Sequence, residues 1–321
     1  MSNSINSKHI FRNLNATSNT ALTIGNFDGV HFGHQAILKQ VTQVAKDRCL
    51  IPSVLTFEPH PREYFGVIGN RPELIPTRIQ SLRDKVISLL SCGIEKVFIQ
   101  RFNKITASMA PEAFIEEILV KGLKTKYLYV GEDFRFGYKR QGDFKMLKSY
   151  SEKFGFEIEF IEDILDKNEV RYSSSELRQA LAYGNVGIAK EIMGRPYQVT
   201  ARVIHGRKLG TDIGVPTMNM RVPQRFALRS GIYVVEVRGL SAGALPAVAN
   251  LGIRPTVDSS GDVLLEVHIL DRNIFSYGKI INVSFLEFIR DEEKFSSVEA
   301  MAIAIHQDIE KTKNYFKKYG I

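Results

Sequence analysis

The sequence predicts two domains of different fold class, an α/β domain with a doubly wound parallel sheet followed by an antiparallel β-barrel with a terminal helix. Up to about residue 186, strand-like apolar runs alternate with segments of helical spacing, which is typical of a parallel sheet covered by helices. Beyond that point the apolar runs are short and have a period of two, which favours an antiparallel barrel. The chain has 321 residues, enough for two cores, because single cores rarely grow past about 250–300 residues. We therefore expect domains at residues 1–186 and 187–321.

The first half contains predicted strands and helices in alternation. The strands are expected at residues 21–24, 53–57, 96–100, 127–130 and 156–160. The helices are expected at residues 35–45, 81–90, 111–120 and 144–154. Sheets of this kind bind ligands beyond the carboxyl ends of their strands, so the motifs that follow the strands are the candidates for a binding site.

The first predicted strand ends in a glycine-rich turn that carries two histidines. The turn at residues 25–29 frees backbone N–H groups, and His31 and His34 fall at or near the N-terminus of the following helix. Free N–H donors and the positive end of the helix dipole favour a phosphate there, and two imidazoles add further donors. Gly25 and Gly33 let the backbone approach a ligand closely. Two histidines at this spacing also occur beside ordinary strand-to-helix turns, so the pair alone leaves both interpretations open.

Two further segments follow predicted strands. In residues 56–61, TFEPHP, the prolines on either side of His60 are expected to stop any helix and to give an extended exit from the sheet. In residues 131–137, GEDFRFG, aromatic residues alternate with arginine, a pattern that stacks on a planar ring or holds phosphate but also occurs in plain packing. Both segments are candidate ligand contacts at one edge of the sheet.

Serines precede another helical run near the end of the first half. Either Ser174 or Ser175 is the expected N-cap, and Arg178 lies one turn inside the helix. A guanidinium at that position is suited to a triphosphate that the helix N-terminus also faces, whereas capping alone explains the serines without any ligand.

The second half is expected to form the barrel. Its strands are predicted at residues 198–204, 231–237, 245–250, 263–270 and 280–288. A long helix that starts near Val298 and stops at Gly320 closes the chain.

Three features of the predicted barrel are candidates for binding or catalysis. The segment GRKLG at residues 206–210 is a glycine-rich turn, although the chain contains no GxxxxGK[ST] sequence and hence no standard P-loop. Such turns are also common as plain corners of barrels.

Thr217 and Asn219 are neutral oxygen ligands one residue apart, which suit a Mg²⁺ that keeps phosphates and waters as its other ligands. Glu266 lies on an otherwise apolar strand, where a carboxylate is either paired or functional.

These motifs, in their order, resemble a known family. GNFDGVHFGH at residues 25–34 resembles the HxGH signature of the Rossmann-like nucleotidyltransferases, in which two histidines hold the α-phosphate of a nucleoside triphosphate. Together with TFEPHP, GEDFRFG and the SxxR segment at residues 175–178, it resembles the first half of the bifunctional prokaryotic riboflavin kinase/FAD synthetases. GRKLGTDIGVPTMN, NLGIRPT, LEVHILD and FIRDEEKF resemble their riboflavin kinase module. The resemblance covers nearly the whole chain.

The resemblance implies two reactions, riboflavin kinase in the barrel and FMN adenylyltransferase in the sheet domain. It implies catalytic roles for His31, His34, Arg178 and Glu266, the last as general base. It implies ATP contacts at Gly25, Phe27, Ser174, Ser175, Gly206, Lys208 and Gly210. It implies flavin contacts at Phe57, Asp133, Phe134, Arg135, Arg290 and Glu292. Mg²⁺ would be held by Thr217 and Asn219, and the small-molecule substrates would be ATP, riboflavin and FMN.

Composition limits the other classes of function. No apolar run approaches the ~20 residues of a membrane span, and the polar start is no signal peptide, so we expect a cytoplasmic protein. Cys49 and Cys92 are expected to be buried free thiols. The formal net charge of +8 is compatible with nucleic-acid binding, but the Lys and Arg residues are scattered. We expect no nucleic-acid or membrane partner, and a monomer or weak homo-oligomer.

Two alternatives stay open at this point. One is an enzyme of the same superfamily with a different acceptor and a barrel that only binds, against which Thr217, Asn219 and Glu266 stand together. The other is a nucleic-acid-binding protein, for which the sequence shows no recognition motif.

Overall fold

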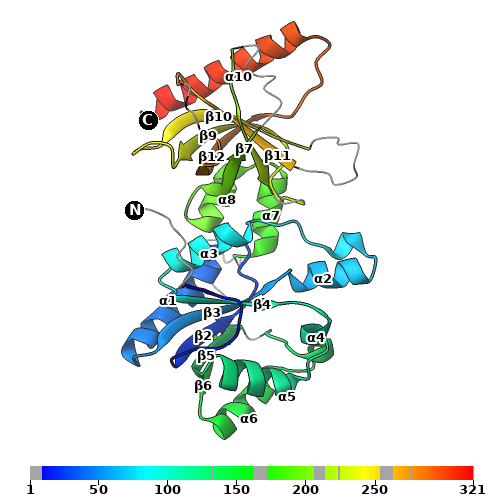
Figure 1. Cartoon of the computed structure of the whole chain (residues 1–321), viewed down its shortest axis with the longest axis vertical. Helices are drawn as coiled ribbons and strands as arrows, with labels where there is room; N and C mark the ends of the chain where they lie inside the picture. The colour runs from blue at the N-terminus through cyan, green and yellow to red at the C-terminus, as the bar shows by residue number, and fades with distance from the viewer. Residues whose placement is uncertain are drawn as a thin grey trace. The chain divides into compact units, whose positions relative to one another are not determined.

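The chain forms two compact units in the computed structural model (Figure 1). The structure describes residues 9–131, 133–161, 172–205, 214–222, 225–253, 263–272, 274 and 276–320. The first unit comprises Met1–Pro76 and Lys85–Ser173, and the second comprises Thr77–Asp84 and Ser174–Ile321. The domain boundary expected at residue 186 stays a prediction.

The first unit is built on a six-stranded parallel sheet with the strand order β1-β4-β3-β2-β5-β6. The strands are β1 (Ile10–Phe11), β2 (Thr20–Ile24), β3 (Ile51–Glu58), β4 (Lys96–Arg101), β5 (Thr125–Gly131) and β6 (Glu157–Ile161). From β2 the chain continues to β3 and β4 on one side and then crosses to β5 and β6 on the other. The predicted doubly wound parallel sheet is confirmed. Its switch point lies at the carboxyl ends of β2 and β5, where such sheets bind ligands.

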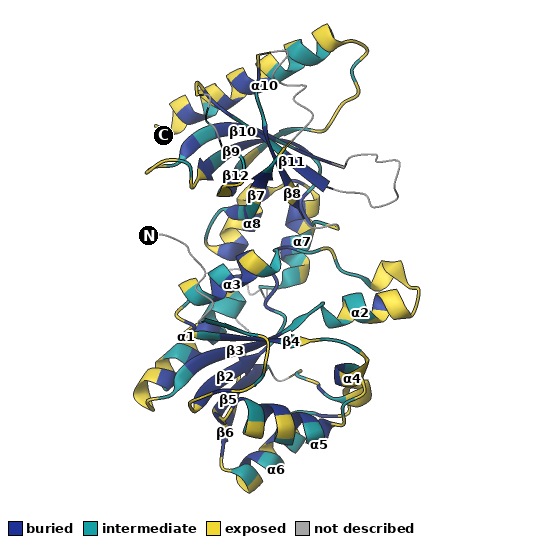
Figure 2. Ribbon diagram, in the orientation of Figure 1, coloured by how far each residue is buried: buried dark blue, intermediate teal, exposed yellow. Residues whose placement is uncertain are grey.

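Helices of several kinds connect these strands. They are α1 (Phe32–Asp47), α2 (Pro61–Ile68), η2 (Pro72–Leu74), α3 (Leu82–Ser91), α4 (Lys104–Ala107), α5 (Pro111–Ala113), the π-helical segment η3 (Phe114–Gly122), η4 (Tyr138–Arg140) and α6 (Phe144–Phe154). Leu22, Leu55 and Phe98 of the sheet pack with Ile115 and Leu119 of η3 in one buried cluster. Figure 2 shows the strands largely buried and the outward faces of the helices exposed. Because each such side chain contributes roughly 1.5–3 kcal/mol on burial, the cluster fixes the sheet that positions the first candidate site.

The helix α2 begins at Pro61, so the expectation that the prolines exclude a helix there is wrong. His60 is the N-cap of α2, and its Nδ1 accepts a hydrogen bond from the backbone N–H of Arg62 at 3.1 Å. Proline fits the first helical position because the N–H that it lacks has no partner inside a helix.

The second unit contains a closed barrel of antiparallel strands with the order β10-β11-β8-β7-β12-β9. The strands are β7 (Tyr197–Ile204), β8 (Met218–Val222), β9 (Gly231–Arg238), β10 (Leu245–Ile253), β11 (Val263–Ile269) and β12 (Ile280–Arg290). The predicted antiparallel barrel is confirmed. The strand β8 was not predicted, because its sequence MNMRV alternates apolar and polar residues over too short a stretch to stand out from the preceding glycine turn.

The second unit also contains α7 (Ser174–Ala182), α8 (Val186–Met193) and the predicted terminal helix, α10 (Val298–Tyr319). Figure 1 shows α10 lying along the barrel. Its side chains Ile309 and Phe316 pack against Ile232 of β9 and Val248 of β10. The helix therefore covers the outer face of these two strands.

The cysteines are free, as predicted, but neither is fully buried. Cys49 is exposed and Cys92 is half-buried. Cys49 follows the end of α1 in a turn with φ 53°, at the surface of the first unit.

Candidate active sites

The loop between β2 and α1 has a strained backbone. Phe27, Gly29 and Val30 have φ values of 48°, 95° and 42°, in the left-handed region. For a β-branched residue this conformation costs about 1–3 kcal/mol and persists only where surrounding contacts impose it. Val30 is 1% exposed, and its carbonyl oxygen accepts a hydrogen bond from Gln35 Nε2 at 2.9 Å. The loop that leads to His31 is therefore held in one shape by α1.

His31 and His34 lie together at the N-terminus of α1. His31 is the N-cap residue and is 5% exposed, and its ring stacks on that of His34 with centroids 3.7 Å apart. The ring of Phe27 lies beside them, with its centroid 5.1 Å from that of His34. A Cβ on Gly33 would lie 3.2 Å from His31 Nδ1, so glycine leaves room for this imidazole. Two imidazoles and the first-turn N–H groups thus gather at the positive end of one helix, an arrangement that suits a phosphate group.

Asn26 was not predicted as a site residue. Its Oδ1 is buried and has no hydrogen-bond partner within the described part of the chain. Its backbone carbonyl oxygen accepts a hydrogen bond from Thr56 Oγ1 at 3.3 Å, which ties the loop to β3. Buried polar atoms are normally satisfied, so this oxygen fits a hydroxyl or amino group of a ligand. The sequence gives little signal for it, because asparagine in a turn usually bonds its own backbone.

Aromatic side chains flank the histidine loop along the carboxyl edge of the sheet. Phe57 is near the end of β3, which pairs with β2 on one side, and Phe134 follows β5, which pairs with β2 on the other. Phe57 meets Phe102 edge-to-face with ring centroids 5.8 Å apart, and Phe134 stacks on Phe136 at 5.6 Å. Both Phe57 and Phe134 are half-buried and pack against the same core cluster. Partly exposed rings of this kind are suited to stacking on a planar ligand.

Asp133 and Arg135 are exposed neighbours of Phe134 at the carboxyl end of β5. Arg135 Nη1 donates a hydrogen bond to the carbonyl oxygen of Phe134 at 3.0 Å. A charged side chain of each sign therefore lies at the same edge of the sheet as the histidines.

Ser174, Ser175 and Arg178 belong to α7 in the second unit. The helix begins at Ser174, so the two serines are its first two residues. Arg178 Nε donates a hydrogen bond to the carbonyl oxygen of Thr77 at 2.7 Å. A role of these side chains at a triphosphate stays a prediction.

Three polar residues form a row across the barrel. Glu266 on β11 is the direct cross-strand partner of Asn219 on β8 and of Asn250 on β10. Side chains so paired share one face, with Cβ atoms about 4.5–5.5 Å apart. Asn219 is 4% exposed, and the Oδ1 atoms of both asparagines are buried without a hydrogen-bond partner among the residues that the structure describes. A carboxylate is thus flanked by two open amide oxygens, of which the one on Asn250 was not predicted.

Glu292, two residues after the end of β12, lies close to these three residues. Its carboxyl group lies against Gly252, where a Cβ would be 2.9 Å from Glu292 Cδ. Burial raises the pKa of Glu292, a hydrogen bond from Asn250 opposes that rise, and the charge of Glu266 adds to it. The predicted residues Glu266 and Glu292 are therefore brought together around Asn250, although Glu266 lies on β11 and Glu292 lies two residues after the end of β12.

Arg290, predicted as a flavin contact, is held by α10. Its Nη2 donates to Asp308 Oδ2 at 2.7 Å, and its Nη1 donates to the carbonyl oxygen of Asp291 at 2.9 Å. These bonds account for the position of Arg290 without a ligand.

The oxygen atoms of Thr217 and Asn219 are the candidates for holding a cation. Among the described residues, no group of three His, Cys, Asp or Glu side chains is placed to hold a metal ion. Thr217 is half-buried and lies directly before β8, with only Met218 between it and Asn219. The open Oδ1 of Asn219 fits a hard cation that takes its remaining ligands from phosphates and water. The predicted residues Gly206, Lys208 and Gly210 lie outside the described residues.

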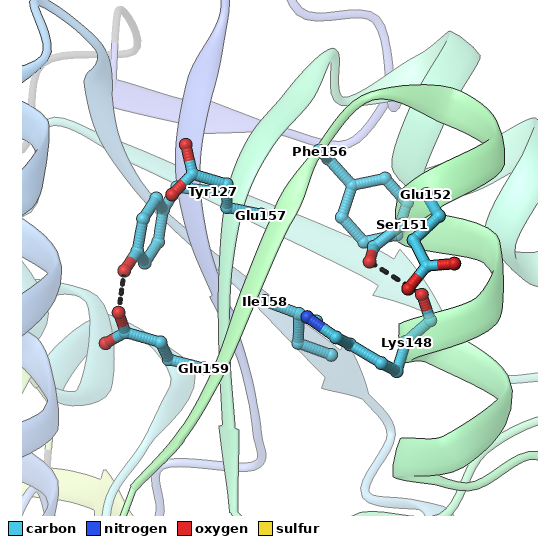
Figure 3. Close-up of a pocket in the computed structure, with 8 residues that line it drawn as sticks. All are labelled: Tyr127, Lys148, Ser151, Glu152, Phe156, Glu157, Ile158 and Glu159. Carbon is cyan, nitrogen blue, oxygen red and sulfur yellow. Dashed lines mark hydrogen bonds between the residues drawn. The ribbon is translucent and has the colours of Figure 1, made fainter.

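A hollow of about 240 Å³ lies near the amino ends of β5 and β6, at the other edge of the sheet (Figure 3). Its lining includes Tyr127, Glu157 and Glu159, and the Tyr127 hydroxyl donates a hydrogen bond to the Glu159 carboxylate. Burial and this carboxylate raise the pKa of Tyr127, which keeps the phenol neutral. None of the predicted site residues lines this hollow.

The chain matches two protein-family profiles. Residues 14–176 match the profile described as FAD synthetase, and residues 193–316 match the one described as riboflavin kinase.

Curated relatives match over nearly their whole length. A bifunctional riboflavin kinase/FMN adenylyltransferase from Haemophilus influenzae is 42% identical over 297 residues, which cover 92% of this chain and 94% of the relative. The protein of the same name from Escherichia coli strain K12 is 40% identical over 295 residues, 92% of either chain.

A solved structure described as a macrolide-efflux protein from Streptococcus pneumoniae has a TM-score of 0.77 and 29% identity, over 95% of this chain and 98% of that chain. The description applies to that protein. In the ranges that the structure describes here, no helix is both long and apolar enough to cross a membrane.

Proposed function

The chain belongs to the family of bifunctional riboflavin kinases/FMN adenylyltransferases, and from this premise we propose which residues carry each reaction. The kinase transfers the γ-phosphate of ATP to riboflavin, giving FMN and ADP. The adenylyltransferase joins AMP from a second ATP to FMN, giving FAD and pyrophosphate. We assign the adenylyltransferase to residues 1–186 and the kinase to residues 187–321. The observation that supports two separate sites is that the histidine pair and the Asn219–Glu266 pair lie in separate compact units.

The adenylyltransferase needs no general base, because the FMN phosphate that attacks is already largely ionised near neutral pH. Its residues have to align the two phosphates and stabilise the charge that develops on the α-phosphate. His31, His34 and the first-turn N–H groups of α1 supply donors for that charge. Ser174, Ser175 and Arg178 are assigned to a triphosphate on the resemblance of their SxxR segment to the family motif.

The nucleoside and the flavin are assigned to the rest of the carboxyl edge. Gly25 and Phe27 line the histidine loop and are assigned to ATP. The half-buried rings of Phe57 and Phe134 would stack on the isoalloxazine ring, with Asp133 and Arg135 at its polar atoms or its phosphate.

The kinase does need a base, because the 5′-hydroxyl of riboflavin must lose a proton as it attacks the γ-phosphate. Glu266 is assigned as that base; it lies on β11 directly across from Asn219 of β8 and Asn250 of β10. Thr217 and Asn219 would hold Mg²⁺, which offsets charge on the transferred phosphate when bound. Gly206, Lys208 and Gly210 are assigned to the ATP of this reaction, and Arg290 and Glu292 to the flavin side.

We further infer a cytoplasmic enzyme that acts on free ATP, riboflavin and FMN, without a nucleic-acid or membrane partner, as a monomer or weak homo-oligomer. The scattered Lys and Arg residues support the absence of a nucleic-acid surface.

The test of the proposed function supplies purified protein with riboflavin, ATP and Mg²⁺ and separates the flavins by chromatography. We expect FMN to appear first and FAD to follow. Formation of neither flavin by the folded protein would overturn the proposal.

Magnesium dependence tests the metal assignment. Chelation of Mg²⁺ is expected to stop FMN formation, and added Mg²⁺ is expected to restore it. The Asn219→Ala variant loses an oxygen ligand, so its half-maximal Mg²⁺ concentration for FMN formation should rise by about tenfold or more. Titration of the initial rate against Mg²⁺ measures this. An unchanged midpoint would remove Asn219 from the metal site.

A glycine pair tests the position of Glu292. In Gly252→Ala the added Cβ would overlap the Glu292 carboxyl group, so kcat/KM for FMN formation should fall by about tenfold or more. The matched control is Gly243→Ala, whose Cβ meets no atom within 4 Å, and it should leave the rate unchanged. Equal values of kcat/KM for the two variants would show that FMN formation does not depend on the position of Glu292 beside Gly252.

A further inference from the structure

A buried ion pair joins the barrel to its terminal helix. Arg290 on β12 donates from Nε and Nη2 to both carboxylate oxygens of Asp308 on α10, at distances between 2.7 and 3.2 Å. The two side chains are only 18% and 4% exposed. Thr312 Oγ1 donates to the backbone carbonyl oxygen of Asp308 at 2.8 Å, which fixes this turn of the helix.

This pair is not required simply to attach α10. Burying two charges is expensive even when they are paired, and a well-packed apolar contact often stabilises as much or more. The apolar contact is already present, since Ile309 and Phe316 pack on the outer face of the barrel. What a two-pronged contact between a guanidinium and a carboxylate adds is a fixed orientation of the arginine.

The orientation of Arg290 fixes the point where the chain leaves β12. Arg290 is the last described partner of β9, opposite Ile232, and a bulge lies just before it. Its Nη1 donates to the carbonyl oxygen of Asp291 at 2.9 Å, so the side chain and the backbone after it are bound together. Arg229 holds the Asp291 side chain at 2.6 Å. The next residue is Glu292.

Glu292 links the Asp308–Arg290 pair to the residues assigned to the kinase site. Its carboxyl group rests on Gly252 and bonds with Asn250, the cross-strand partner of Glu266. A shift of the chain after Arg290 would move Glu292 away from both.

We propose that Asp308 is a positioning residue for the kinase reaction, which holds Arg290 and so places the Glu292 carboxylate beside Asn250 and Glu266. Asp308 acts through Arg290 and touches neither substrate. This inference rests on the proposed assignment of Glu266 and Glu292 to the kinase site.

The test is a double-mutant cycle with Asp308→Asn and Glu292→Gln in the full chain. We measure kcat and KM for FMN formation against riboflavin at saturating ATP and Mg²⁺, the melting temperature, and FAD formation from supplied FMN as an internal reference. Each single variant should lower kcat/KM by about tenfold or more. The double variant should lie within about twofold of Glu292→Gln alone, because Asp308 acts only by placing that carboxylate. The control Glu310→Gln, in an exposed ion pair on the same helix, should leave kcat/KM unchanged.

The outcomes separate this inference from the site assignment. If Glu292→Gln leaves FMN formation unchanged, the assignment of Glu292 to the kinase site fails. If both single variants lower the rate and their losses multiply in the double variant, the assignment stands and the positioning role is wrong. An unchanged rate in Asp308→Asn also overturns the positioning role. Asp308→Glu, which keeps the charge, should recover part of the rate, and if neither Asp308 variant folds, the residue is structural and the proposal is rejected.

Discussion

Replacing Glu266 with glutamine is expected to lower the rate of FMN formation by a factor of about 10²–10⁴, while FMN supplied directly is still converted to FAD. Glutamine has nearly the same shape as glutamate and keeps the cross-strand contacts with Asn219 and Asn250, but it cannot accept the proton of the riboflavin hydroxyl. Initial rates of both steps, measured by chromatography of the flavins, give the result.

The control for this change is Glu287→Gln, which removes an exposed carboxylate from the same barrel and should alter neither step. Retention of FMN formation by Glu266→Gln would show that another group acts as the base. Loss of both steps in a folded protein would contradict two separate sites.

Replacing His34 with alanine is expected to have the reverse effect. The rate of FAD formation from FMN should fall by about 10²–10³, the usual loss when one donor to a developing charge is removed, whereas FMN formation should continue. The loss includes any shift of His31, because the two rings stack 3.7 Å apart. Pyrophosphate release with FMN and ATP as substrates measures the step.

His306→Ala is the matched control, because this histidine is exposed on α10 in the second unit. It should leave FAD formation unchanged. If His34→Ala lowered the rate of FAD formation only slightly and His31→Ala left that rate unchanged, the phosphate would have to bind away from the N-terminus of α1.

The strands and the larger helices could be predicted because each is marked by its own local pattern. The run from Thr20 to Ile24 is fully buried and apolar enough to identify a strand without any tertiary information. Local patterns failed where one residue type has two uses. A proline after a strand is typical of a helix stop, but Pro61 occupies the first position of α2. The polar residues Asn219 and Arg221 interrupt the apolar pattern that would indicate the short strand β8.

The site residues likewise include some that a local pattern predicts and others that only tertiary contacts bring together. His31 and His34 could be predicted as a pair because their spacing within one turn and helix is enough to bring them together. Asn250 and Asp308 could not, since they reach Glu266 and Arg290 through strand register and helix packing. Those contacts are set by closure of the barrel and leave no pattern in any single segment.

The most direct test of the account mixes the two defective variants. Glu266→Gln alone should form almost no FMN from riboflavin, and His34→Ala alone should stop at FMN. If the two reactions occur in separate sites, the mixture should make FAD from riboflavin, because FMN released by one variant serves as the substrate of the other. A mixture that makes no FAD, although each variant is folded and keeps its own step, would contradict two sites that work independently.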